Sequence, residues 1–176
     1  MGPREFRNRF KEAMPEVPED MGIELAEFGT YPKEVLEKLN LPEQDLRILR
    51  EVGFPTESAP FLSFSHNVGE ALILFSELNP GAGDEFECYK YFGHNGTGDP
   101  ICIDERDGSI VSLDHESGMT RRLYNSSLTQ FAETLCLLAE AMHGGTNLDF
   151  MNELLKIDEP AAGETAIWAT EHSQVI

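Results

Sequence analysis

Apolar residues recur at helical spacing in three segments of the first third of the chain. The segment "REFRNRFKEAM" (4–14) predicts a short helix, after which the chain is polar and interrupted by prolines. "YPKEVLEKLN" (31–40) and "LPEQDLRILREVGFP" (41–55) predict two more helices, the second of which ends at Gly53 and Pro55. We assign residues 1–30 to an N-terminal extension and residues 31–176 to a single domain.

The hydrophobic period changes in the middle third, where short apolar runs alternate with turn signals rich in glycine, asparagine and aspartate. These runs predict strands at 61–65, 71–76, 88–94, 100–105, 109–116 and 120–125. Their connections are too short for helical crossovers, so the sheet is expected to be mainly an antiparallel meander. The dipeptide Asp107-Gly108 predicts a type I′ hairpin turn, which needs positive φ at both central residues.

Helical spacing returns after residue 125. "NSSLTQFAETLCLLAEAMHGG" (125–145) predicts a long helix with a capping box of Ser127 and Gln130 and a glycine stop at 144–145. A shorter helix is predicted at 147–157, and Trp168 is expected to dock the tail against the body. The order of helices, strands and helices predicts an α+β fold with a mainly antiparallel sheet of about five or six strands and helices packed on one face.

Charge changes this picture most. The 176 residues include 13 Lys or Arg and 32 Asp or Glu, for a net charge of −19. Such a surface disfavours nucleic acid and anionic membranes as partners and favours a cationic protein, although solubility alone would also explain it.

The cysteines and the N-terminus bear on the compartment. Cys88, Cys102 and Cys136 have neither disulfide-framework nor zinc spacing, and Cys102 and Cys136 are expected to be small core hydrophobes. We find no secretory signal pattern and no apolar run approaching the roughly 20 residues of a membrane span. A cytoplasmic location is therefore expected.

The segment "FGHNGTGDPICIDERDGSIVSLDHE" (92–116) concentrates the candidate chemistry. A calcium loop starting at Asp104 fails, because an arginine takes its third position, and His94 and His115 lack zinc spacing. Asp114 and His115 are adjacent on a predicted strand, so they should point to opposite faces rather than form a dyad. We predict no catalytic residue, no metal and no cofactor; a small hydrolase using His94, Asp104, Asp114 and His115 is the less favoured alternative.

The same segment supplies the residues expected to contact a partner. Its aromatic side chains suit an interface anchor, although aromatic residues at a strand end more often belong partly to the core. The predicted partner-binding residues are Tyr89, Tyr91, Phe92, His94, Asn95, Asp104, Glu105, Asp107, Asp114, His115 and Glu116.

The run "FGHNGTGDPICIDERDGSIVSLDHE…LYNSSLTQFAETL" resembles the SUKH superfamily, which includes many bacterial immunity proteins and a fungal cell-wall-synthesis regulator. The resemblance covers roughly residues 40 to 170 and is closest to the subfamily with an NSSLxxF motif at the start of its helix. The matching positions are Gly93, Gly98-Asp99-Pro100-Ile101, Ile110 to Glu116, Asn125-Ser126-Ser127 with Phe131, Lys156, Ile157, Asp158 and Trp168.

The resemblance implies an α+β domain that binds through a groove and catalyses nothing. Many members neutralise a cognate polymorphic or contact-dependent toxin, often a nuclease or deaminase, by direct binding. Residues 77–116 carry ten acidic and two basic residues, which fits a partner with a basic substrate cleft. We therefore expect an immunity protein, monomeric or weakly homodimeric; an intracellular adaptor or regulator using the same groove is the alternative.

Overall fold

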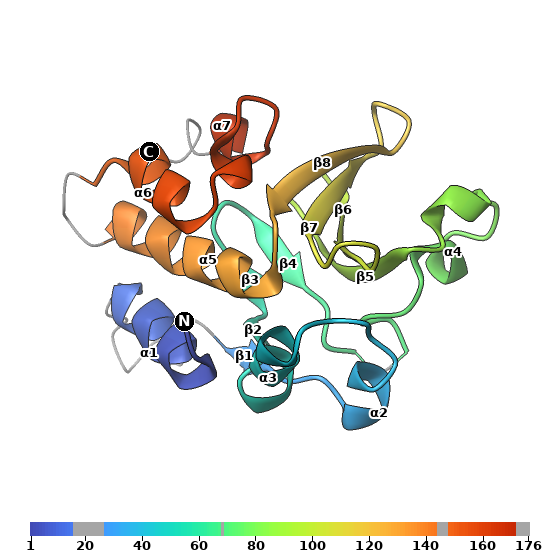
Figure 1. The fold of residues 1–176 in the computed structure, drawn as a ribbon, viewed down its shortest axis with the longest axis horizontal. Helices are drawn as coiled ribbons and strands as arrows, with labels where there is room; N and C mark the ends of the chain where they lie inside the picture. Colours follow the sequence, from blue (N-terminus) through green and yellow to red (C-terminus); the bar gives the residue numbers. More distant parts are fainter. Residues whose placement is uncertain (16–26, 68, 144–147, 172–176) are drawn as a thin grey trace.

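The structure, a computed structural model, describes residues 1–15, 27–67, 69–143 and 148–171. Its main sheet has six antiparallel strands in the order β3-β4-β5-β6-β7-β8, and β1 pairs with β2 in a second small sheet. The helices α1, α3, α5 and α6 gather beside the strands (Figure 1). The α+β class and the strand number predicted from the sequence are confirmed.

The strands and helices have the following bounds. The strands are β1 Phe28–Gly29, β2 Phe54–Pro55, β3 Glu57–Ser58, β4 Leu62–Phe64, β5 Tyr89–His94, β6 Pro100–Asp104, β7 Ile110–Asp114 and β8 Thr120–Asn125. The helices are α1 Pro3–Ala13, α2 Lys33–Leu36, α3 Glu43–Glu51, α4 Phe75–Leu78, α5 Leu128–His143, α6 Phe150–Ile157 and α7 Trp168–Glu171, with 3-10 turns η2 Asp84–Phe86 and η3 Pro160–Ala162.

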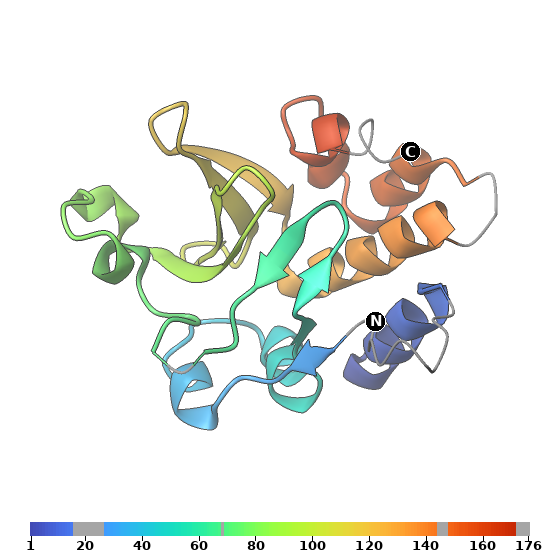
Figure 2. The same cartoon turned by 180° about the vertical axis from the view of Figure 1, so that it is seen from behind.

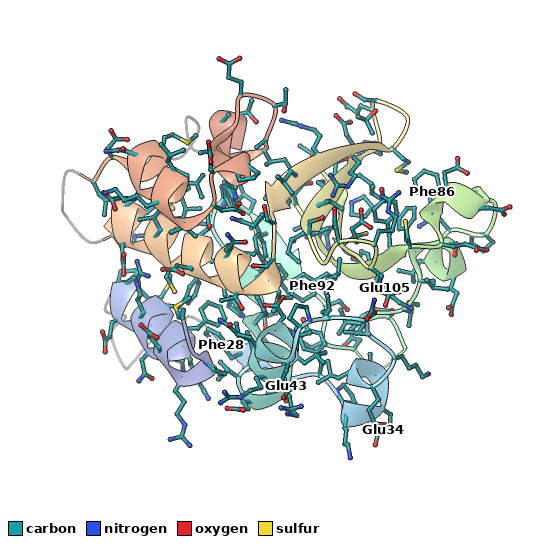
Figure 3. The ribbon with its side chains drawn as sticks, in the orientation of Figure 1. Phe28, Glu34, Glu43, Phe86, Phe92 and Glu105 are labelled. Atoms are coloured by element: carbon teal, nitrogen blue, oxygen red, sulfur yellow. The ribbon has the colours of Figure 1, made fainter. Side chains whose placement is uncertain are left out.

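An aromatic core lies where the helices meet the sheet. Phe54, Phe64 and Phe92 come from three different strands, and their ring centroids are 4.9 to 5.4 Å apart. Phe131 of α5 packs on the same group. Figure 3 shows Phe92 next to α5. Seen from behind, the β3–β4 hairpin lies between α5 and the longer strands (Figure 2). These side chains come from distant parts of the chain, so their packing joins the helices to the sheet.

The N-terminal helix belongs to this core. Phe6 and Phe10 of α1 are 0% and 1% exposed, and both pack against Phe28 at centroid distances of 5.4 and 5.7 Å. Arg9 donates two hydrogen bonds, of 2.6 and 2.8 Å, to the Glu140 carboxylate of α5. The segment assigned to an extension from the sequence thus contributes a helix to the main core.

The other face of the sheet carries a second, smaller apolar cluster. It includes Cys102, Val111 and Leu113, and Phe75 of α4 packs on it. Phe86 of η2 joins at the outer edge of the molecule (Figure 3). Strands β6 and β7 are therefore apolar on both faces, which explains why their sequences read as nearly continuous hydrophobic runs.

Two local predictions are wrong. The run 71–76 is not a strand: Leu72 has a φ of 60°, which breaks the extended backbone, and α4 begins at Phe75 after one bridge from Leu74. The Asp107-Gly108 turn is not type I′. Of its two residues only Gly108 has positive φ, 77°, and Asp104 and Ser109 close a four-residue loop between β6 and β7.

The predicted long helix is α5, and its first turn has more contacts than the capping box predicts. The Gln130 amide donates to the Ser127 hydroxyl at 3.2 Å, but the Gln130 side chain donates to the Ile157 carbonyl. The buried Asp45 carboxylate of α3 accepts from the Thr129 amide at 2.9 Å. The glycine stop at 144–145 lies outside the described residues.

The C-terminal segment docks as predicted. Trp168 is 0% exposed, and its indole N–H donates to the Asn125 side chain at 3.0 Å. The Asn125 amide in turn donates to the buried Asp158 carboxylate at 3.1 Å. This network holds the last part of the described chain against β8.

Candidate functional site

The antiparallel meander divides the predicted partner-binding residues between two ends of the same strands. The β6–β7 loop lies at one end, beside the first residue of β5. The β5–β6 loop and the β7–β8 loop lie together at the opposite end. Tyr89, Asp104, Glu105 and Asp107 fall at the first end, whereas His94, Asn95, Asp114, His115 and Glu116 fall at or near the second.

Asp104 organises the first end. Its carboxylate accepts hydrogen bonds from the Arg106 side chain at 2.9 and 2.7 Å and from Arg121 Nε at 3.0 Å. The Asp104 side chain is fully buried, and Arg106 also donates to the Tyr89 hydroxyl at 2.8 Å. Burial acts to raise the pKa of Asp104, but the hydrogen bonds from Arg106 and Arg121 outweigh it, and that pKa is lowered.

Asp107 and Glu105, at the same end, also have partners within the protein. Asp107 is exposed and accepts from the Ser109 backbone amide at 2.9 Å and from Arg121 at 3.2 Å. Glu105 lies 3.6 Å from the Lys90 ammonium group. The charges of this end are therefore matched within the protein.

Two of the predicted contact residues have no access to a partner. Phe92 and Asp104 are each 0% exposed, because Phe92 belongs to the aromatic core and Asp104 lies under its two arginines. Tyr91 is half-buried, and its hydroxyl lies 3.4 Å from Nδ1 of the exposed His94. We therefore exclude Phe92 and Asp104 from the proposed contact surface.

The loop at the second end is held by Asn95. Its side-chain oxygen accepts from the Thr97 amide at 3.1 Å and from the Asp99 amide at 2.9 Å. Gly98 has a φ of 87°, which a residue with a side chain would adopt only with strain. The loop therefore presents Asp99 toward the neighbouring β7–β8 loop in a fixed position.

Asp99 joins the two loops. Its Oδ1 atom lies 2.5 Å from His115 Nδ1 and accepts from the His115 backbone amide at 2.9 Å. Burial acts to raise the pKa of Asp99, but the hydrogen bonds from His115, Thr97 and Asn95 together lower that pKa. The sequence predicts opposite faces for Asp114 and His115 but does not reveal the pairing of His115 with Asp99.

These loops and the middle of the sheet line a partly open pocket of about 190 Å³, which we call the Ser112 pocket. Ser112 lies on β7 in register with Arg122 of β8, is 2% exposed, and its hydroxyl has no hydrogen-bond partner among the described residues. The β7–β8 loop and the segment before α7 rise on the same side of the molecule (Figure 1). The pocket is lined by Asn95, Thr97, Asp99, Ser112, Asp114, His115, Glu116, Arg122 and Ile167.

Four of the predicted contact residues meet at this pocket, and five of its lining residues were missed. The predicted ones are Asn95, Asp114, His115 and Glu116; the missed ones are Thr97, Asp99, Ser112, Arg122 and Ile167. One signal was available: Ser112 is polar within an apolar strand and two residues from Asp114, so both point to the same face. The contribution of Ile167 depends on tertiary packing, because its amide donates to the Leu123 carbonyl of β8.

The pocket holds a serine, a histidine and an aspartate, but they are not hydrogen-bonded to one another as in a hydrolase triad. In a triad the nucleophilic serine hydrogen-bonds to its base, and the Ser112 hydroxyl makes no such bond to His115. Within the described ranges, no three His, Cys, Asp or Glu side chains are grouped so as to hold a metal ion. No helix of the described chain is long and apolar enough to cross a membrane.

These observations define a mixed α+β domain with a small polar pocket at one end of its sheet. A family model for SUKH-4 immunity proteins matches residues 21–173, and the chain belongs to that family. The superfamily inferred from the short motifs is thus confirmed. No curated protein and no solved structure matches the chain. Family membership supports an immunity role and implies binding to a cognate toxin.

Proposed function

We propose that this chain is a bacterial immunity protein that binds a cognate polymorphic or contact-dependent toxin and neutralises it without catalysing a reaction. The observation that carries the proposal is the SUKH-4 match over residues 21–173. Binding alone suffices for such a role, because an inhibitor needs only to occupy the surface on which the toxin acts. The cytoplasm, where a toxin that enters the cell would meet its target, is the proposed place of action.

The toxin is proposed to be basic around its active cleft, as a nuclease or deaminase acting on nucleic acid would be. Support comes from the net charge of −19 and from the ten acidic residues between 77 and 116. Opposite potentials accelerate encounter and suppress wrong partners. The pocket end of the sheet is the proposed contact surface, because exposed His94, His115 and Glu116 lie there while the carboxylates of the other end are already matched.

The test is co-expression with the toxin domain encoded beside the gene. We expect a complex that co-elutes in size-exclusion chromatography, restores growth to toxin-expressing cells, and associates more slowly as salt is raised. Failure to form a complex at low salt with any toxin encoded nearby would contradict the proposal. Stable capture of a non-toxin partner from the same operon would instead favour the adaptor function.

A further inference from the structure

We propose that the Ser112 pocket receives one basic side chain, an arginine or a lysine, from the bound partner protein. This inference rests on the proposed function in taking the partner to be the toxin. It adds what the family match does not give: the place on this chain where an anchoring residue of the partner inserts, and the chemistry of that residue.

The size of the pocket fits a single side chain. Its volume is about 190 Å³, whereas sites for drug-sized ligands and cofactors occupy about 300–1,000 Å³. Buried Ser112 marks the inner part of the pocket, and exposed His115 and Glu116 lie at its mouth. A long side chain with a polar end group can therefore reach inward while its stem passes the mouth.

The charges around the pocket favour a cation. Three carboxylates line it against one arginine and one histidine. Arg122 donates to the neutral Thr170 hydroxyl at 3.3 Å and keeps its charge, and His115 is paired with Asp99, so the lining is net negative. Glu116 makes no hydrogen bond or ion pair with any described residue, and Asp114 accepts from the Ser117 backbone amide at 3.0 Å through only one of its two carboxylate oxygens. Carboxylates with free acceptor positions bind guanidinium and ammonium groups through charge-assisted hydrogen bonds.

The Ser112 hydroxyl provides an independent reason. A buried hydroxyl without a partner is unfavourable, and native proteins keep few of them. Ser112 lines the pocket and is such a group. An N–H donated by an inserted side chain would satisfy its oxygen, so binding would remove a defect that the free protein carries.

The first experiment uses a small probe on the full chain. Nα-acetyl-argininamide is titrated into the ¹⁵N-labelled protein, and Nα-acetyl-citrullinamide, a neutral molecule of nearly the same shape, is the control. We expect the amide signals of Ser112, Asp114 and His115 to shift with the arginine compound and not with the citrulline compound. Equal shifts with both compounds, or shifts confined to other regions, would overturn the proposal.

Paired variants locate the contact. Asp114→Asn with Glu116→Gln is expected to weaken binding of the arginine probe about tenfold, the effect of one charge-assisted pair. The matched control, Asp84→Asn with Glu85→Gln, makes the same charge change at exposed residues of η2 and should leave the affinity unchanged. Equal weakening by both pairs would show that only net charge matters, which contradicts a specific pocket.

Ser112→Ala separates binding from folding. The variant should bind the arginine probe about threefold more weakly, while the free protein unfolds at a higher urea concentration because an unpaired buried hydroxyl is gone. Unchanged affinity in a folded Ser112→Ala protein would count against the role of the hydroxyl.

The toxin complex distinguishes this inference from the proposed function. If the toxin binds the Asp114→Asn, Glu116→Gln protein as tightly as the unaltered protein, the pocket is not the anchor, but the immunity role stands. If the arginine probe binds at Ser112 and no neighbouring toxin binds at all, the immunity role fails while the pocket keeps its chemistry.

Discussion

Two groups of carboxylates lie at opposite ends of the same strands, and they differ in what surrounds them. At the β6–β7 end, fully buried Asp104 accepts hydrogen bonds from Arg106 and Arg121. At the pocket end, the carboxylates of Asp99, Asp114 and Glu116 have one histidine as their cationic ion-pair partner within the described chain. The first group is internally neutralised, and the second keeps unused acceptor oxygens beside a cavity.

The difference shows why net charge alone says little about where a protein binds. A buried carboxylate is tolerated when hydrogen bonds and opposite charges replace its lost hydration, and such a group adds little to the field outside. Carboxylates without such partners keep their field at the surface and attract cations. Of the acidic residues between 77 and 116, those at the pocket end are thus the better candidates for recognition.

The largest effect is expected from removing the charge of Asp104. Asp104→Asn should lower the free energy of unfolding by roughly 3 kcal/mol, because it leaves two arginines without their shared carboxylate. Equilibrium urea unfolding followed by circular dichroism measures this. Glu116→Gln is the matched substitution at the pocket end and should change stability by less than about 0.5 kcal/mol. Comparable losses in both variants would erase the distinction between the two ends.

The second-largest effect is expected on toxin affinity, for which a substitution at the pocket end should have the larger effect. Glu116→Lys should weaken the toxin complex about thirtyfold, about 2 kcal/mol, because it places a positive charge against a basic partner. Glu85→Lys, at an exposed site on η2, makes the same charge change and should weaken the complex much less. Biolayer interferometry at several salt concentrations provides both rates. Equal losses for the two variants would indicate a diffuse electrostatic surface instead of a localised contact.

Much of the fold could be predicted because it depends on local periodicity. The strands at 88–94, 100–105, 109–116 and 120–125 correspond to β5 to β8, and the long helix to α5. The strand predicted at 71–76 failed because its apolar run does not reveal the positive φ of Leu72. The role of Gly93 could not be predicted from its neighbours in sequence. The β-carbon of any side chain there would lie 2.1 Å from the Ser63 carbonyl oxygen of β4, so only glycine fits.

The site could be predicted only in part, because its members meet through tertiary structure. A meander brings alternate loops together, so Asn95 and His115 share one end although they are distant in sequence. The sequence does not reveal which carboxylate finds an arginine: Asp104 and Asp114 both end apolar strands, yet one is fully buried and the other partly exposed. Arg106 lies only two residues from Asp104, whereas Arg121, the second arginine, reaches Asp104 from β8 through tertiary structure.

The smallest expected effect is a pH dependence that both ends share. The pKa values of Asp99 and Asp104 are lowered from the ordinary 3.8, so the unfolded chain binds protons at these sites before the folded protein does. Their contribution to stability is therefore complete above pH 3.8 and is lost as the pH falls through the folded pKa values. Urea midpoints measured from neutral pH to below 3.8 should decline accordingly.

Asp99→Asn provides the control for that decline at the pocket end. The variant should be less stable than the unaltered protein at neutral pH, and the gap should narrow as acid protonates Asp99, because a protonated carboxyl then resembles the amide. The difference in stability between Asp104→Asn and the unaltered protein should be larger at neutral pH, because Asp104 is fully buried under two arginines. This difference should also narrow as the pH falls. A gap that stays constant with pH would mean that neither carboxylate stabilises the fold through its charge, and the contrast between the two ends would then have to rest on burial alone.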